Sequence, residues 1–121
     1  MFYEGGRNNM EIARMANALS KSWSVESSTK WSRDNPSAGQ CGVTALVVND
    51  LLGGEIKKTK LPDGWHFYNF IKNKRYDFTV SQFRERILYM DITSNRDEAY
   101  ADTYEGQNTY LKQKVLDFLF N

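Results

Sequence analysis

The chain contains one cysteine and one histidine, Cys41 and His66, and both fall where a thiol nucleophile and its base could act. A thiol attacks a carbonyl only as the thiolate, and a free cysteine with a pKa of about 8.5 is only slightly ionised at neutral pH. A helix N-terminus stabilises an anion by about 0.3–1 kcal/mol, which lowers a pKa by less than about one unit. Activation of Cys41 therefore requires an imidazole beside the sulfur, and His66 is the one candidate.

Asp77 is the candidate for the third group, which orients the imidazole of such a base. Aromatic-rich runs bounded by turn residues predict two strands, one carrying His66 and the other Asp77. With a two-residue turn at Lys72-Asn73, Asp77 lies diagonal to His66 on the same face, about 7–8 Å away between backbones. A turn slipped by one residue would separate the two by two further rungs. The triad hypothesis therefore predicts the register of this hairpin.

Acyl transfer also requires hydrogen-bond donors for the oxyanion that forms on the attacked carbonyl. The backbone N–H of Cys41, free at a helix start, is the expected first donor, and the side-chain amide of Gln40 is a candidate for the second. We expect Trp31 and Trp65 to be walls of a cleft or parts of the core. One cysteine and one histidine cannot build the usual closed zinc site without two carboxylates, so we expect no metal and no cofactor.

The stretch 36–54 must position Cys41. It begins with turn residues, continues as an apolar run over 43–52 and ends at Gly53-Gly54. This pattern predicts a short helix that is buried nearly all round, with Cys41 in its first turn and Gly53 as the left-handed residue at its end.

Periodicity and turn residues predict the other elements. Residues 1–8 are expected to be a flexible tail, and 9–121 a single α+β domain with flanking N- and C-terminal helices. Asn8 or Asn9 is the expected cap of the first helix. The remaining expectations are a helix to about 22 or 23, a long connection over 24–40, strands at 55–60, 65–71 and 75–79, a short helix at 82–86, an extended segment or helix end at 87–92, a surface loop at 93–105 and an amphipathic helix at 107–120.

The composition is ordinary for a soluble globular protein and argues against several other classes. The 121 residues are 40% hydrophobic and 26% charged, with a formal net charge of +1. Nucleic-acid-binding proteins usually carry a basic face, so we expect no nucleic-acid partner. No apolar run approaches the roughly 18–20 residues of a membrane span, and the N-terminus lacks the pattern of a secretory signal. One cysteine forms no internal disulfide, so we expect a cytoplasmic protein without membrane contact.

Four segments carry a resemblance to the small bacterial YunG family: GQCGVTALV at 39–47, GGEI at 53–56, WHFYN at 65–69 and YDFTVSQF at 76–83. Trp31 and the 94–96 loop fit as well, so the resemblance covers about 23–120. The layout is similar to papain-like cysteine hydrolases, in which a cysteine starts the central helix and a histidine and Asp or Asn follow on neighbouring strands.

The resemblance implies a papain-like fold with a central buried helix packed on a small antiparallel sheet. It also implies that Cys41 is the nucleophile, His66 the base and Asp77 the orienting group. Papain-like enzymes place the oxyanion glutamine several residues before the cysteine, whereas Gln40 is its immediate neighbour. The substrate would be a small molecule or peptide with an acyl or amide group, and peptidase, amidase, deamidase and transferase activities all use the same triad.

Each of these residues also has a structural interpretation. Cys41 can be a small core residue, His66 a packed aromatic, and Gln40 a loop residue. Asp77 can pair with Arg75 or Lys74, or cap a turn. The alternative function is a non-catalytic binding or regulatory module that holds a small molecule or peptide in a cleft between two tryptophans, Trp31 and Trp65. A redox-sensing thiol is a third hypothesis.

Overall fold

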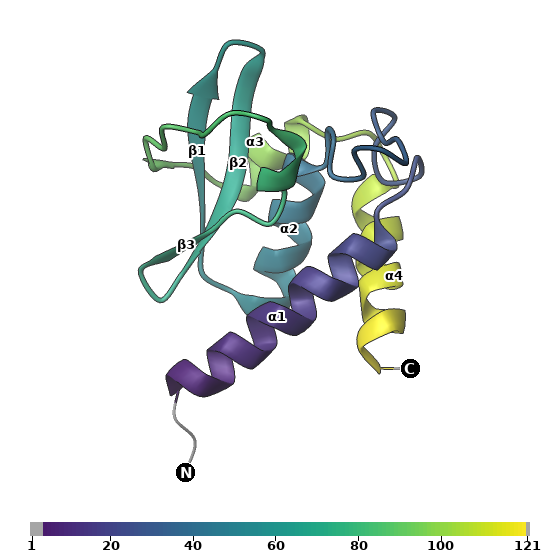
Figure 1. The fold of residues 1–121 in the computed structure, drawn as a ribbon, viewed down its shortest axis with the longest axis vertical. Helices are drawn as coiled ribbons and strands as arrows, with labels where there is room; N and C mark the ends of the chain where they lie inside the picture. The colour runs from purple at the N-terminus through teal and green to yellow at the C-terminus, as the bar shows by residue number, and fades with distance from the viewer. Residues whose placement is uncertain (1–3, 121) are drawn as a thin grey trace.

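The structure is a computed structural model that describes residues 4–120 of the chain. These residues form an α+β fold in which helices pack on one small antiparallel sheet (Figure 1). The elements in chain order are α1 Glu4–Ser22, α2 Cys41–Leu52, β1 Glu55–Leu61, β2 Gly64–Ile71, β3 Lys74–Tyr76, a 3₁₀ turn at Val80–Gln82, β4 Ile92–Thr93, α3 Arg96–Ala101 and α4 Gln107–Phe120. The sheet order is β3-β2-β1-β4, so the α+β class predicted from the sequence is confirmed.

The centre of the fold is α2, which lies between the sheet and the other two long helices (Figure 1). All seven residues from Gly42 to Val48 are buried, as expected for a helix with almost no polar face. One side of α2 packs on α1 and α4 through Met15, Leu19, Val43, Val47, Leu111 and Val115. The other side packs on the sheet and α3 through Ala45, Leu46, Ile56, Phe67 and Ala99. Burial of each large aliphatic side chain stabilises the fold by about 1.5–3 kcal/mol, so the position of Cys41 is firmly set.

The β2–β3 hairpin has the register that the triad hypothesis requires. Ile71 pairs with Lys74 across a two-residue turn, and Lys72 and Asn73 have φ values of 52° and 63°. Two successive positive φ angles define the turn type that matches the twist of a hairpin, and asparagine tolerates them well. β3 ends at Tyr76, earlier than the predicted 75–79, because the chain turns away at Asp77.

A fourth strand and an extra helix occupy 87–105. β4 pairs with β1 through Lys58 and Ile92, so the sheet has one strand more than the three predicted, and the segment 87–92 is extended at its end. The prediction of a loop over all of 93–105 is wrong, because α3 lies within it. Asn95 caps α3 by accepting a hydrogen bond from the backbone N–H of Glu98. Asn95 and Glu98 have the three-residue spacing of a capping box, which is the sequence signal for this helix.

Two boundaries differ from the sequence expectations. α1 already includes residues from Glu4 onward, so neither Asn8 nor Asn9 starts it, and only 1–3 of the expected tail lie outside the described residues. The helix expected at 82–86 is limited to the turn at Val80–Gln82, because Phe83 is extended. α4 has its predicted bounds and buries Leu111 and Val115. Within 4–120, no helix combines the length and apolarity that crossing a membrane requires.

Candidate functional site

His66 and Asp77 form a buried pair on the face of β2 that is turned away from α2. His66 Nε2 lies 2.7 Å from Asp77 Oδ2, and the two side chains are 2% and 4% exposed. Tyr89 donates its hydroxyl to the same Oδ2 at 2.7 Å, and the backbone N–H of Thr79 donates to Oδ1 at 3.2 Å. These donors fix the carboxylate, and the carboxylate fixes the imidazole. The predicted contact between His66 and Asp77 is therefore confirmed.

The second ring nitrogen of His66 is the unusual feature of this pair. His66 Nδ1 is buried and has no hydrogen-bond partner. The ring of Phe83 packs edge-on against the imidazole at 4.9 Å between centroids. A buried polar atom without a partner costs about 1–3 kcal/mol, so its retention calls for an explanation. Because Asp77 accepts from Nε2, the nitrogen left to take a proton from another group is Nδ1.

Cys41 begins α2 as predicted, but its thiol does not contact the imidazole. The thiol donates to Asp102 Oδ2 across 3.7 Å. Burial raises the pKa of Cys41 to about 12, the negative charge of Asp102 adds to the shift, and a backbone hydrogen bond from Phe67 opposes it. The thiol is therefore protonated in this conformation. The expectation that His66 pairs with the sulfur is not met in this conformation, in which the thiol hydrogen-bonds to Asp102 and His66 Nδ1 has no partner.

The alternation of side chains on β2 explains this separation. Phe67 packs on α2 beside Cys41, so the preceding residue, His66, points to the opposite face. The sulfur nevertheless reaches the backbone of β2 at Phe67, one residue from His66. β3 ends where Tyr76 pairs with Asn69, so no β3 residue pairs with β2 at His66 or Phe67. The thiol and the imidazole thus lie on either side of a strand edge that β3 leaves open.

Asp102 was missed by the sequence analysis because it falls in the expected loop. It follows the last turn of α3 and lies against the first turn of α2. A Cβ atom on Gly42 would lie 2.7 Å from Asp102 Oδ2 and 2.9 Å from the backbone oxygen of Ala99, so only glycine fits. Burial raises the pKa of Asp102, while hydrogen bonds from Cys41 and the Gly42 backbone and the charge of Lys30 act against the shift. The carboxylate therefore occupies the anion-stabilising N-terminus of α2.

Gln40 is buried, but its amide does not face the sulfur. Its Nε2 donates to the backbone oxygen of Ser24 at 3.4 Å, and its Oε1 has no partner. Gln82 is a second amide near the start of α2, and it is half-buried. Its Oε1 accepts the backbone N–H of Gly39 at 3.2 Å, and its Nε2 is buried without a partner. Gln82 lies in the segment 76–83 that carried the family resemblance, yet nothing in its spacing indicated this position.

Trp31 and Trp65 have different surroundings. Trp31 is half-buried, with an unpartnered Nε1, whereas Trp65 is 41% exposed. Lys58 places its ammonium 4.3 Å from the Trp65 ring, so this tryptophan belongs to the basic surface of the sheet. Among the described residues no ring contact joins the two tryptophans. In the same part of the chain, no cluster of three or more His, Cys, Asp or Glu side chains is arranged to hold a metal ion.

Comparison with known proteins gives a consistent assignment. A family model described as YunG protein matches residues 11–120. The chain is also 52% identical over 95 residues to a protein of Bacillus subtilis (strain 168) whose name is "Uncharacterized protein YunG". That match covers 78% of this chain and 83% of the relative. No solved structure matches.

Proposed function

The chain belongs to the YunG family, and from the site that it carries we propose that it is a cysteine-dependent hydrolase or acyltransferase of papain-like layout. Cys41 is the nucleophile, His66 the base and Asp77 the group that orients the base. One observation carries the proposal: His66 Nδ1 is buried and unpartnered beside the strand edge that the Cys41 sulfur reaches, while Nε2 is held on Asp77 at 2.7 Å. Such an arrangement suits general-base catalysis.

The proposed reaction gives each of these side chains a defined role. His66 Nδ1 takes the thiol proton, and the Cys41 thiolate attacks an amide, ester or thioester carbonyl. A sulfur–carbon bond forms, the bond from the carbonyl to the leaving group breaks, and the leaving group departs with the proton from the imidazolium. Water or another acceptor then gives a proton to His66 and attacks the acyl-enzyme. The sulfur–carbon bond breaks, and the thiolate takes that proton back from His66. The backbone N–H of Cys41 and the Nε2 of Gln82 are the proposed donors to the oxyanion, with Gln82 in place of Gln40 because its amide is anchored two residues before the cysteine.

Asp102 holds the site in a resting state in this scheme. A thiol with a pKa of about 12 is not a nucleophile at neutral pH. The carboxylate of Asp102 sits where a substrate carbonyl oxygen would meet the N-terminus of α2. Substrate binding therefore displaces Asp102, which frees the thiol to turn toward His66. The proposed substrate is a small molecule or peptide with an acyl or amide group, and the proposed location is the cytoplasm.

A non-catalytic binding module is the second candidate, and the contact between Cys41 and Asp102 favours it. If that contact is permanent, the thiol is a structural donor and His66 is a packed aromatic. In this case the thiol reacts slowly whatever occupies the position of residue 66, because nothing activates it.

Trapping of an acyl-enzyme separates the two candidates. The protein is incubated with a panel of activated esters and thioesters, and its intact mass is followed with time. We expect a transient acyl adduct on the wild type that is absent from Cys41→Ser and at least about a hundredfold slower in His66→Gln, the usual scale of a general base. Equal acylation rates in the wild type and His66→Gln would contradict the enzyme proposal and support the binding module.

A further inference from the structure

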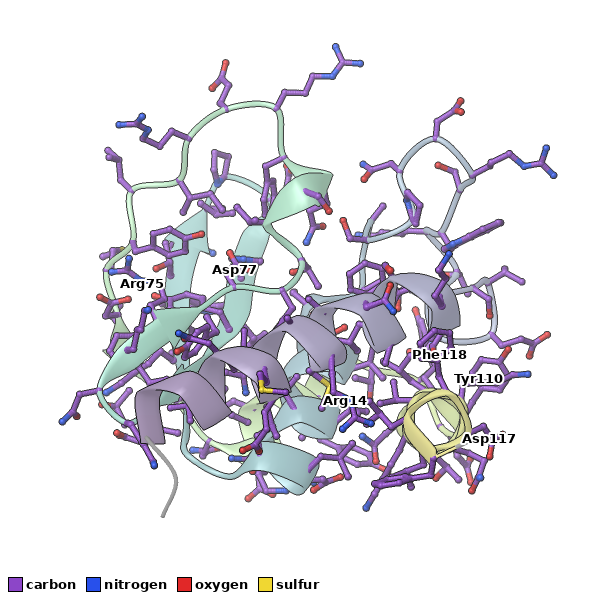
Figure 2. The ribbon with its side chains drawn as sticks, turned by 60° about the horizontal axis from the view of Figure 1, so that its bottom comes forward. Arg14, Arg75, Asp77, Tyr110, Asp117 and Phe118 are labelled. Atoms are coloured by element: carbon purple, nitrogen blue, oxygen red, sulfur yellow. The ribbon has the colours of Figure 1, made fainter. Side chains whose placement is uncertain are left out.

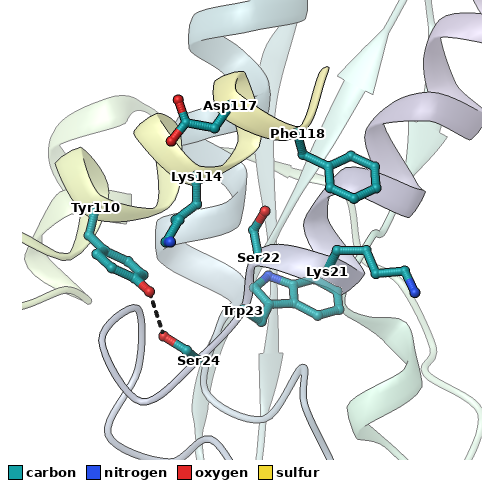
Figure 3. Close-up of a pocket in the computed structure, with 8 residues that line it drawn as sticks. All are labelled: Lys21, Ser22, Trp23, Ser24, Tyr110, Lys114, Asp117 and Phe118. Atoms are coloured by element: carbon teal, nitrogen blue, oxygen red, sulfur yellow. Dashed lines mark hydrogen bonds between the residues drawn. The ribbon is translucent and has the colours of Figure 1, made fainter. Parts of the chain in front are cut away.

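A pocket of about 400 Å³ opens between the end of α1 and α4 (Figure 3). This volume lies within the range of roughly 300–1,000 Å³ found for small-molecule sites. The residues that line it are Lys21, Ser22, Trp23, Ser24, Tyr110, Lys114, Asp117 and Phe118. Figure 2 shows Tyr110, Asp117 and Phe118 around α4, well away from Asp77 at the sheet. The pocket is therefore separate from the candidate catalytic residues.

Aromatic side chains that are held in place form the walls of the pocket. The indole N–H of Trp23 donates to Thr44 Oγ1 at 2.9 Å, which ties this ring to α2. The Ser24 hydroxyl donates to the Tyr110 hydroxyl at 3.2 Å and links the loop to α4. Phe118 is 44% exposed on the same side of α4. A flat apolar group can pack on such fixed rings at little entropic cost.

The Lys114 ammonium stands at this pocket without a carboxylate partner, whereas the Lys21 ammonium points to the opposite side, beyond Trp23 (Figure 3). Neither Lys21 nor Lys114 forms an ion pair within the described part of the chain. The Lys114 ammonium lies 5.9 Å from the centre of the Tyr110 ring and is turned toward the Tyr110–Ser24 side of the pocket (Figure 3). Asp117 forms no ion pair with Lys114, because its carboxylate points away from this ammonium and its Oδ1 accepts a hydrogen bond from Gln113 at 2.8 Å (Figure 3).

We propose that this pocket binds a small organic anion, namely a carboxylate attached to a planar apolar group. The rings of Trp23, Tyr110 and Phe118 take the apolar part, and Lys114 takes the carboxylate with help from the Ser22 and Ser24 hydroxyls. A charge-assisted hydrogen bond of this kind is about twice as strong as a neutral one, so the anion is selected over its uncharged amide. Inorganic phosphate lacks the apolar group that the rings require.

The pocket wall also contacts the start of α2. Ser24 accepts a hydrogen bond from Gln40 through its backbone oxygen, and Trp23 binds Thr44. Neither bond involves the Cys41 thiol, so the proposal stands independently of the thiol chemistry. Cys41→Ser should therefore bind the anion as the wild type does.

The test is an NMR titration that follows the Trp23 indole N–H with benzoate, benzamide, acetate and inorganic phosphate as probes. We expect a saturable shift with benzoate, and at least about tenfold weaker binding of the other three. Lys114→Gln should weaken benzoate at least about tenfold. Lys112→Gln on the same helix should leave it unchanged, because the Lys112 ammonium lies on Asp50 at 3.5 Å outside the pocket.

Four results would overturn the proposal: no saturable benzoate shift up to its solubility limit, benzamide or phosphate binding as tightly as benzoate, acetate binding as tightly as benzoate, or equal benzoate affinity in the two lysine variants. Loss of binding in Cys41→Ser would contradict the claimed separation of the pocket from the thiol. Failure of the acyl-enzyme experiment alone leaves this proposal intact, because the titration involves no covalent step.

Discussion

At the scale of single residues, Asp102 and His66 are two alternative partners for the Cys41 thiol. Asp102 holds the Cys41 thiol at 3.7 Å, and His66 leaves a buried nitrogen unpartnered near the same strand edge. The contact with Asp102 joins residues that are 61 apart in sequence. Asp102 directly follows α3, a helix in a segment that was predicted to be a loop. The His66–Asp77 contact was predictable because a short hairpin with recognisable turn residues fixes it. The Cys41–Asp102 contact depends on how α3 docks, which local patterns do not encode.

Replacement of Asp102 by asparagine should make Cys41 more reactive. The substitution removes a negative charge that raises the thiol pKa, so the apparent pKa from the pH profile of iodoacetamide alkylation should fall below that of the wild type. We expect at least about a tenfold faster reaction at neutral pH, since one pKa unit is a factor of ten in thiolate. Asp97→Asn, on the exposed first turn of α3, is the matched control. An alkylation rate in Asp102→Asn no faster than in Asp97→Asn contradicts this assignment.

The same substitution should not weaken the fold at neutral pH. The pKa of Asp102 is raised from its ordinary value, so the folded state binds this proton more tightly than the unfolded chain does. An ionised carboxylate in such a position reduces stability above its folded pKa, and the reduction disappears as pH falls. Urea unfolding at pH 7 should therefore give Asp102→Asn a free energy of unfolding equal to or above that of the wild type. A lower value would mean that the charge stabilises the junction between α2 and α3.

At the scale of elements, the close approach of α2 and α3 at Gly42 organises the site. The burial of α2 and the pairing of β2 with β3 follow from patterns within single segments, so the sequence predicted both. α3 is only six residues long and rich in charged residues, so it resembles a surface loop despite its capping box. The short β3 has no sequence signal either, because Asp77 leaves the strand in order to bind the Thr79 backbone.

Gly42→Ala tests the junction between these helices. In an isolated helix this change stabilises by about 1 kcal/mol. Here the new methyl group would meet Asp102 and the backbone oxygen of Ala99 within 3 Å, so we expect a loss of about 1–3 kcal/mol in urea unfolding. The double variant Gly42→Ala, Asp102→Ala should recover part of the loss. A more stable Gly42→Ala protein would show that α3 does not pack against α2 as described.

The β2–β3 turn gives a second test at this scale. Asn73 has a φ of 63°, where glycine is favoured and a β-branched side chain is strained. Asn73→Gly should leave stability unchanged or slightly higher, whereas Asn73→Val should lower it by about 1–2 kcal/mol in thermal unfolding. A loosened turn also loosens the register that holds Asp77 beside His66. Equal stability of the two variants would rule out the two-residue turn.

At the scale of the whole molecule, the segment 77–91 covers the His66 face of the sheet and is closed by one ion pair. Arg75 donates two hydrogen bonds to the Asp91 carboxylate, from Nε at 2.9 Å and from Nη2 at 2.6 Å. The Tyr68 hydroxyl donates to the same carboxylate at 2.9 Å. Hydrogen bonding from Arg75 is the main reason that the pKa of Asp91 lies below its ordinary value. This pair fastens the segment that carries Phe83 and Tyr89 over the buried imidazole.

The pH dependence of stability should show the contribution of the ion pair between Arg75 and Asp91. A depressed carboxyl pKa contributes stability that is present above the unfolded value of 3.8 and is lost as pH falls through the folded value. Arg75→Gln should therefore lower the melting temperature at pH 7, and the difference from wild type should shrink toward about pH 2–3. Lys74→Gln, the exposed neighbour, is the control. A melting-temperature difference that is the same at every pH would contradict an ionic origin.

The central claim, that His66 serves Cys41, is tested most directly by the rate of Cys41 alkylation at neutral pH in Asp102→Asn and in Asp102→Asn, His66→Gln, followed by intact mass. With the competing carboxylate neutralised in both proteins, only the imidazole differs. If His66 takes the thiol proton, the double variant reacts at least about tenfold more slowly than Asp102→Asn, although both lack the Asp102 charge. If the double variant reacts as fast as the single one, the reactivity of the Cys41 thiol depends on the charge of Asp102 and not on His66. The proposed catalytic pair of Cys41 and His66 would then not exist.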